Sequence, residues 1–198
     1  MLVSWAGTIP KLCDVQPLLT NTFQEKNEVN LLYFETERLV ARQLEQKDFD
    51  EFNEMQGNSK VMKYTVGRAK TREENKSEFE NIISGYFLSE TNRIVMGISR
   101  KSDETSSLVG ACAVEKLDLE CVEVGYRFLE KYWGNGFGLE VLEGLLTYSL
   151  LELGAKEVIA EVYKENINSV RVLEKSYMDF IKEYTEEKSI VQVYGLKK

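Results

Sequence analysis

A strand, a glycine-rich loop and a helix follow one another near the middle of the chain, and this unit constrains the fold more than any other part. Residues 122–128 alternate apolar and polar side chains, the period of a half-buried strand. Apolar residues at 142–153 recur at helical spacing and end at Gly154, a residue type that often follows a helix. A strand that leads directly into a helix favours an α/β fold.

Patterns of the same two kinds extend over most of the chain. Thr71 and Glu74 have the spacing of a capping box, and residues behind them show helical periodicity. Residues 1–31 hold both prolines and show no period. We therefore interpret 1–31 as an N-terminal extension and 32–198 as a single α/β domain, with a mixed central β-sheet flanked by helices. Other strands are expected at 39–44, 93–99, 107–114, 158–163, 178–184 and 190–196, and other helices at 48–55 and 168–175.

The most informative feature of the composition is the absence of histidine from all 198 residues. This absence excludes Ser-His-Asp and Cys-His catalysis, histidine general bases and histidine metal ligands. Any chemistry must therefore use carboxylates, hydroxyl groups, backbone dipoles or a bound cofactor.

Charge and cysteine usage narrow the partners and the compartment. A net charge of −8 argues against a nucleic-acid partner. Cys13, Cys112 and Cys121 have no metal-ligand spacing. No segment reaches the roughly 20 apolar residues of a membrane span, and no secretory signal is recognised. We expect a cytoplasmic protein without a membrane partner.

The loop after residue 128 has the composition of a phosphate-binding site. Gly134, Gly136 and Gly138 alternate just before the helix, so backbone N–H groups can converge with the positive end of the helix dipole. Such a loop can hold a pyrophosphate. The spacing excludes both the dinucleotide fingerprint and the Walker A loop. A glycine-rich connection without a ligand is the alternative.

Four segments together resemble the GCN5-related N-acetyltransferases, and within them the ribosomal-protein N-terminal acetyltransferases. The first is the loop 133–140, Trp-Gly-Asn-Gly-Phe-Gly-Leu-Glu. The others are Phe-Glu-Thr-Glu-Arg-Leu at 34–39, Val-Glu-Val-Gly-Tyr at 122–126, and Asn-Ile-Asn-Ser at 166–169 followed by Val-Leu-Glu-Lys at 172–175. The resemblance covers about residues 33–198 and implies a GNAT-like fold.

The resemblance implies acetyl-CoA as cosubstrate, no metal, and a set of cofactor contacts. The loop N–H groups would hold the pyrophosphate, and strand backbone would pair with the pantetheine arm. Trp133 is interpreted as packing under the loop, and Asn166 and Ser169 have helix capping as the alternative role. The implied contacts are Tyr126, Phe128, Leu129, Trp133, Gly134, Asn135, Gly136, Phe137, Gly138, Leu139, Asn166 and Ser169.

Two residues are candidate catalytic groups. Glu123 would take the proton of the acceptor amine, although an outward-facing polar residue of a half-buried strand is the alternative. Ser169 would assist the departing thiolate, by resemblance. Leu173 stands where many relatives outside this branch have a tyrosine acid, and Tyr177 replaces a usual glycine.

The acceptor is expected to be a primary amine, first a protein N-terminal α-amine. Small amines such as polyamines or aminoglycosides are the alternative. The resemblance also implies that residues 64–68 line the acceptor site. Two alternatives are not enzymes: a CoA-binding sensor without catalysis, and a protein-interaction module without a cofactor. The protein is expected to be a monomer or homodimer.

Overall fold

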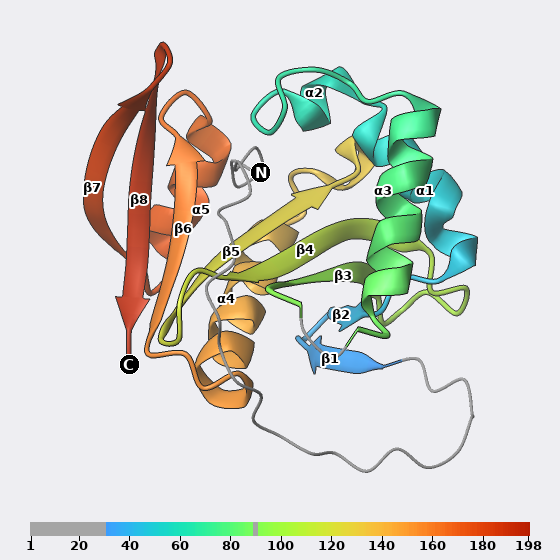
Figure 1. Cartoon of the computed structure of the whole chain (residues 1–198), viewed down its shortest axis with the longest axis horizontal. Coiled ribbons are helices and arrows are strands. Elements are labelled where there is room, and N and C mark those ends of the chain that lie inside the picture. The colour runs from blue at the N-terminus through green and yellow to red at the C-terminus, as the bar shows by residue number, and fades with distance from the viewer. Residues whose placement is uncertain (1–30, 89–90) are drawn as a thin grey trace.

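The computed structural model describes residues 31–88 and 91–198, which form one eight-stranded sheet with helices on both faces (Figure 1). The strand order is β1-β2-β3-β4-β5-β6-β8-β7. Neighbours run antiparallel, except that β5 and β6 are parallel. The strands are β1 Leu32–Glu35, β2 Leu39–Arg42, β3 Arg93–Arg100, β4 Leu108–Lys116, β5 Cys121–Phe128, β6 Glu157–Tyr163, β7 Asp179–Glu186 and β8 Ser189–Lys197.

The helices form two groups because the sheet buries apolar residues on both faces. Three of them, α1 Phe49–Gln56, α2 Ser59–Met62 and α3 Arg72–Gly85, cover one face. On the other face lie α4 Phe137–Thr147 and α5 Ile167–Lys175. This two-layer burial explains why several central strands read as nearly continuous apolar runs.

The feature that positions a site is the divergence of β5 from β6. Only Cys121, Val122 and Glu123 of β5 pair with β6, although both strands continue. Figure 1 shows β5 and β6 spreading apart from this point. Backbone groups on the β6 side of β5, beyond Glu123, are therefore left for another extended chain to pair with.

The sequence-derived fold class and most elements are confirmed. Thr71 caps α3, accepting from Glu74 N, while the Glu74 side chain accepts from Thr71 N. Gly154 has a φ of +71°, the conformation expected of a residue that ends a helix. The domain boundary at residue 31/32 stays a prediction, since residues 1–30 lie outside the described part of the chain.

Five local features differ from the sequence-based expectations. The strand expected at 39–44 ends at Arg42, and β1 and the short α2 were missed because each has only four residues. The helix expected at 142–153 already begins at Phe137. Its last part, Tyr148–Glu152, widens into a π-helical turn, in which Leu153 N donates to Tyr148 O. Apolar periodicity does not distinguish this turn from α-helix.

Candidate active site

The glycine loop forms a cradle at the N-terminus of α4. Gly134 and Gly136 both have a φ of +78°, which residues with a Cβ adopt only at a cost. Gly138 is required for another reason: a Cβ there would lie 2.9 Å from the Tyr126 hydroxyl oxygen. Two glycines thus shape the turn, and the third lets α4 approach β5.

A carboxylate of α4 anchors this loop to the start of the domain. Glu140 accepts hydrogen bonds from Thr36 Oγ1 at 2.6 Å, Arg38 N at 2.7 Å and Arg38 Nε at 2.7 Å. Burial raises the pKa of Glu140, but these hydrogen bonds outweigh it and hold the pKa below its usual value. Arg38 also donates to Asn135 O at 3.0 Å and lies over the Phe137 ring. The loop is therefore preorganised.

Sequence reasoning missed Arg38 and Glu140 as partners. Both lie in segments that carry the family resemblance, 34–39 and 133–140, but nothing in the sequence shows that these segments meet. Arg38 and Glu140 are 102 residues apart in the sequence, and they come into contact only in the folded domain. The presence of an arginine in one motif and a glutamate in the other was the signal that could have predicted this ion pair.

The predicted cofactor contacts on β5 can act only through their backbone. The side chains of Tyr126 and Phe128 point away from the α1–α3 face and pack in the core beside Phe137, and Leu129 is also buried. The backbone groups of Tyr126 and Phe128 lie on the edge that β6 leaves, whereas Leu129 N faces β4 and donates to Val109 O at 3.1 Å. Trp133 is 40% exposed and donates from Nε1 to Phe128 O at 3.0 Å, so it ties the loop to the end of β5 instead of packing beneath the loop.

Asn166 and Ser169 lie together at the start of α5, which follows β6 across the divergence. Asn166 is the N-cap residue, and its carbonyl oxygen accepts from Ser169 N at 2.9 Å. Ser169 is fully buried in the first turn of α5 and is not the residue that caps it. Asn166 therefore occupies the capping position, although its side chain makes no capping hydrogen bond. The role of Ser169 in thiolate departure stays a prediction.

Glu123 lies at the last residue pair before β5 and β6 diverge, on the face covered by α1–α3. Glu115 of β4 is directly opposite it, and Arg93 of β3 is opposite Glu115. Burial, then the charges of Glu161 and Glu115, raise the pKa of Glu123 to about 8, while Arg93 acts in the opposite direction. A carboxylate at this point can exchange a proton near neutral pH.

Tyrosines and carboxylates of β6 and β7 form the opposite wall of the divergence. Tyr184 donates from its hydroxyl to Glu161 Oε2 at 2.7 Å. Tyr163 donates to Glu186 at 2.9 Å and its ring contacts that of Tyr64, with centroids 6.4 Å apart. Tyr64 also donates to Glu165 O at 3.0 Å, so the predicted acceptor segment 64–68 reaches across to the end of β6.

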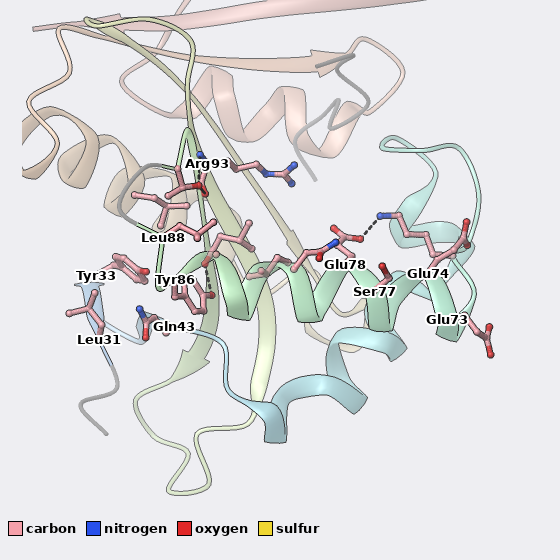
Figure 2. A pocket seen from close by; sticks show the side chains of 17 residues that line it. Leu31, Tyr33, Gln43, Glu73, Glu74, Ser77, Glu78, Tyr86, Leu88 and Arg93 are labelled. Atoms are coloured by element: carbon pink, nitrogen blue, oxygen red, sulfur yellow. Dashed lines mark hydrogen bonds and ion pairs between the residues drawn. The ribbon is translucent and has the colours of Figure 1, made fainter. Parts of the chain in front are cut away.

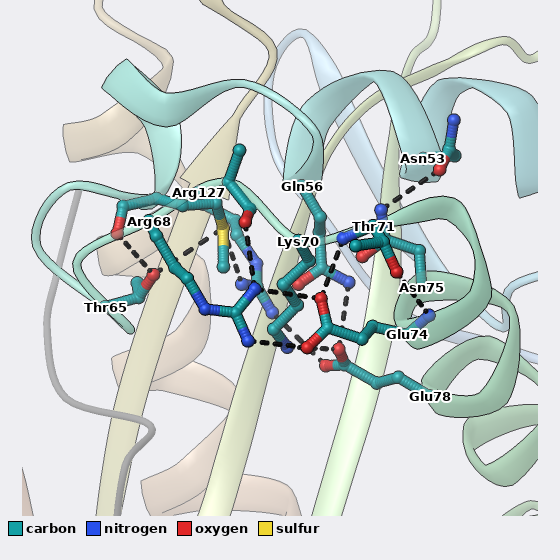
Figure 3. A network of polar contacts seen from close by, with 12 residues as sticks. Asn53, Gln56, Thr65, Arg68, Lys70, Thr71, Glu74, Asn75, Glu78 and Arg127 are labelled. Atoms are coloured by element: carbon teal, nitrogen blue, oxygen red, sulfur yellow. Dashed lines mark hydrogen bonds and ion pairs between the residues drawn. The ribbon is translucent and has the colours of Figure 1, made fainter.

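A polar network links that segment to β5 (Figure 3). Arg127 is buried, and burial lowers its pKa to about 10 although Glu78 lies 3.8 Å away. Glu78 also accepts from Lys70 and from Gln56 Nε2. Burial would raise the pKa of Glu78, but Arg127 and Lys70 hold it below its usual value. The network fixes the helical layer on the strand that carries Glu123.

Two thiols, those of Cys112 and Cys121, lie in the part of the chain that the structure describes. Burial raises the pKa of Cys112, and burial together with Glu157 raises the pKa of Cys121. A raised pKa disfavours the thiolate form, so neither of these two thiols has the environment of an activated nucleophile. In the described ranges 31–88 and 91–198 there is also no group of three or more Cys, Asp or Glu residues that could hold a metal ion. No helix in these ranges is long and apolar enough to cross a membrane.

Comparison with known proteins identifies the family. Residues 38–179 match the model of the acetyltransferase (GNAT) domain. The uncharacterized N-acetyltransferase YoaA of Bacillus subtilis (strain 168) is 31% identical over 156 residues, which are 75% of this chain and 82% of YoaA. The chain therefore belongs to the GNAT acetyltransferases, and it is an acetyl-CoA-dependent N-acetyltransferase.

Solved structures share the fold but differ in what their names say they acetylate. RimL, a ribosomal L7/L12 α-N-protein acetyltransferase in complex with coenzyme A, aligns with a TM-score of 0.69 at 12% identity, covering 84% of this chain and 98% of RimL. Spermidine N-acetyltransferase from Vibrio cholerae, in complex with CoA and spermine, aligns with a TM-score of 0.68 at 17% identity, covering 80% and 95%. The acceptor of this chain is therefore open.

Proposed function

We propose that this enzyme acetylates a protein N-terminal α-amine by direct attack in a ternary complex. The observation that carries the proposal is the position of Glu123 at the end of the β5–β6 pairing. An acceptor amine must reach this point, because the free edge of β5 is where the pantetheine arm would end.

The acid–base properties of Glu123 favour an α-amine. An N-terminal α-amine has a pKa of roughly 7.7–8.0, against about 10.4 for an alkyl amine such as lysine. The pKa of Glu123, about 8, is close to the first value. Proton transfer from an α-ammonium group to Glu123 would therefore cost little free energy.

The chain would hold acetyl-CoA at three places. The cradle from Gly134 to Leu139 would bind the pyrophosphate through backbone N–H groups, with Asn166 as a further contact. The β5 edge from Tyr126 to Leu129 would pair with the pantetheine arm, and an N–H there would polarise the thioester carbonyl. No metal is needed for this chemistry.

The transfer step balances without a covalent enzyme intermediate. The α-ammonium group first gives one proton to Glu123, which releases it to water. The neutral amine nitrogen then forms a bond to the acetyl carbon, and the carbon–sulfur bond breaks. The second nitrogen proton reaches the departing thiolate through water or through the Ser169 hydroxyl, which donates one proton to sulfur and regains one from the nitrogen side.

A small cationic amine is a second candidate, favoured by one observation. Glu115, Glu123 and Glu161 surround the point where the amine would react, and a polyamine would carry several charges to them. If the protein were instead a noncatalytic CoA-binding sensor, it would bind acetyl-CoA but acetylate no acceptor.

The test measures CoA release from acetyl-CoA with N-terminal peptides, spermidine and an aminoglycoside. Turnover on peptides with a free α-amine, abolished when that amine is blocked, would support the proposal. Turnover on spermidine alone would replace it with the second candidate, and binding of acetyl-CoA without any turnover would favour the sensor.

A further inference from the structure

A cleft of about 970 Å³ lies between α3 and β3 (Figure 2). Arg93, which lines it, stands in the same cross-strand row as Glu123. One wall is the side of α3 between Glu73 and Gly85. The other wall begins at Arg93 on the sheet and ends near Leu31 and Tyr33. The proposed transfer step uses none of this cleft, although its volume lies in the range of ligand sites.

The cleft begins near the proposed reaction point. Arg93 lines it and stands in one cross-strand row with Glu115 and Glu123. Two strand spacings of about 4.8 Å place the Arg93 backbone roughly 10 Å from that of Glu123. A chain whose amine lies at Glu123 can therefore enter the cleft within about three extended residues.

The lining of the cleft changes from charged to apolar along α3. Near the N-terminal half of α3 lie Glu73, Glu78 and Lys70; Glu78 is paired with Lys70, whereas Glu73 has no ion-pair partner among the residues the structure describes. At the other end, Leu31 and Leu88 are 49% and 65% exposed. Exposed large apolar side chains that gather in one cleft mark a binding surface.

The length of the cleft fits an extended peptide. Glu73 and Gly85 are twelve helical positions apart, which corresponds to about 18 Å at 1.5 Å per residue. An extended chain covers that distance with about five residues. In the charged half, Glu73 provides an acidic partner for a basic side chain, and the apolar end provides contacts for a nonpolar one.

We propose that this cleft binds the residues that follow the acceptor amine of a protein N-terminus, with a nonpolar side chain of the acceptor seated between Leu31, Tyr33 and Leu88. This inference rests on the proposed function, because it requires a peptide acceptor. It adds a determinant of specificity remote from the reacting atoms, so that acceptor length and sequence control KM.

Gly85 allows a direct test. A Cβ built at Gly85 meets no atom within 4 Å, so Gly85→Phe would place a ring in the cleft without backbone strain. Ser84→Phe is the matched control, since Ser84 is the exposed neighbour that does not line the cleft. Acetylation of a hexapeptide amide and of a dipeptide amide with the same first two residues is measured for the full chain and both variants.

The expected result is a selective loss. Gly85→Phe should raise KM for the hexapeptide roughly tenfold, equivalent to losing about 1.4 kcal/mol of binding, and leave the dipeptide and kcat unchanged. Ser84→Phe should leave both peptides unchanged. Equal effects on both peptides, or no difference between the two variants, would overturn the inference while the peptide acceptor stands.

Two other outcomes separate the inference from the proposed function. If neither peptide is acetylated but spermidine is, the peptide acceptor itself is wrong and the cleft assignment falls with it. If Gly85→Phe impairs spermidine acetylation and leaves the hexapeptide unaffected, the cleft belongs to a small amine.

Discussion

Replacing Glu115 with glutamine should move the acidic limb of the pH profile of kcat/KM to lower pH. This limb reports ionisation of the free enzyme, and Glu123 must lose its proton to act as a base. With a pKa of about 8 for Glu123, activity of the natural protein should rise with pH through about 8. Removing the negative charge opposite Glu123 makes its ionised form less unfavourable, so its pKa falls.

The size of the shift follows from the strand register. Directly opposite residues of an antiparallel pair have Cβ atoms about 5 Å apart, and their carboxylates would lie about 6 Å apart. Two unit charges at 6 Å interact with about 2.8 kcal/mol at a dielectric constant of ~20 and about 0.7 kcal/mol at ~80. Both side chains are half-buried, so about 1.4 kcal/mol is a reasonable middle value, which corresponds to roughly one pH unit.

The assay compares Glu115→Gln and Arg93→Gln with the natural protein on one acceptor, so that the acceptor's own ionisation cancels. The two variants should shift the limb in opposite directions, because Glu115 raises and Arg93 lowers the pKa of Glu123. Limbs that coincide in all three proteins would refute Glu123 as the titrating base.

Three further predictions concern Glu123 and the loop. Glu123→Gln should lower kcat by roughly 10²-fold or more, with acetyl-CoA affinity retained. The raised pKa of Glu123 means that the folded state favours the protonated carboxyl, so the stability of the natural protein should fall as pH rises from about 4.5 through 8. Melting curves of Glu123→Gln should lack that loss. Gly136→Val should abolish acetyl-CoA binding in calorimetry while circular dichroism stays native, and retained affinity would remove the cradle. Gly138→Ala should cost about 1–3 kcal/mol in denaturant unfolding, and Tyr126→Phe added to it should restore part of that loss.

The sequence predicts elements best where burial imposes a period over many residues. The strand 122–128 and the helix behind Thr71 agree with the structure within a residue or two, since each has a repeated pattern and the helix has a capping box. Short elements such as β1 carry too few residues for a period. The π-helical turn at Tyr148–Glu152 depends on hydrogen bonding that apolar spacing does not encode.

For the candidate site, the sequence identified groups but not their relations. The sequence pattern identified the three loop glycines but not the different reason why each is glycine. The close approach of Gly138 to the Tyr126 hydroxyl depends on how α4 packs on β5. The surroundings of Glu123 could not be predicted either. Glu115 is eight residues away in sequence and Arg93 thirty, and only the register of β3, β4 and β5 brings all three together.

The same register explains why the acceptor question depends on more than the reacting carboxylate. Glu123 and Glu115 would attract any amine, and cationic charge alone does not distinguish an N-terminal peptide from a polyamine. The row that contains them continues to Arg93, and Arg93 is where the cleft along α3 begins. Discrimination between acceptors would therefore arise from the part of the molecule attached to the amine: a peptide can fill both the charged and the apolar half of the cleft, whereas a short polyamine would leave the apolar end beside Leu31 and Leu88 unused.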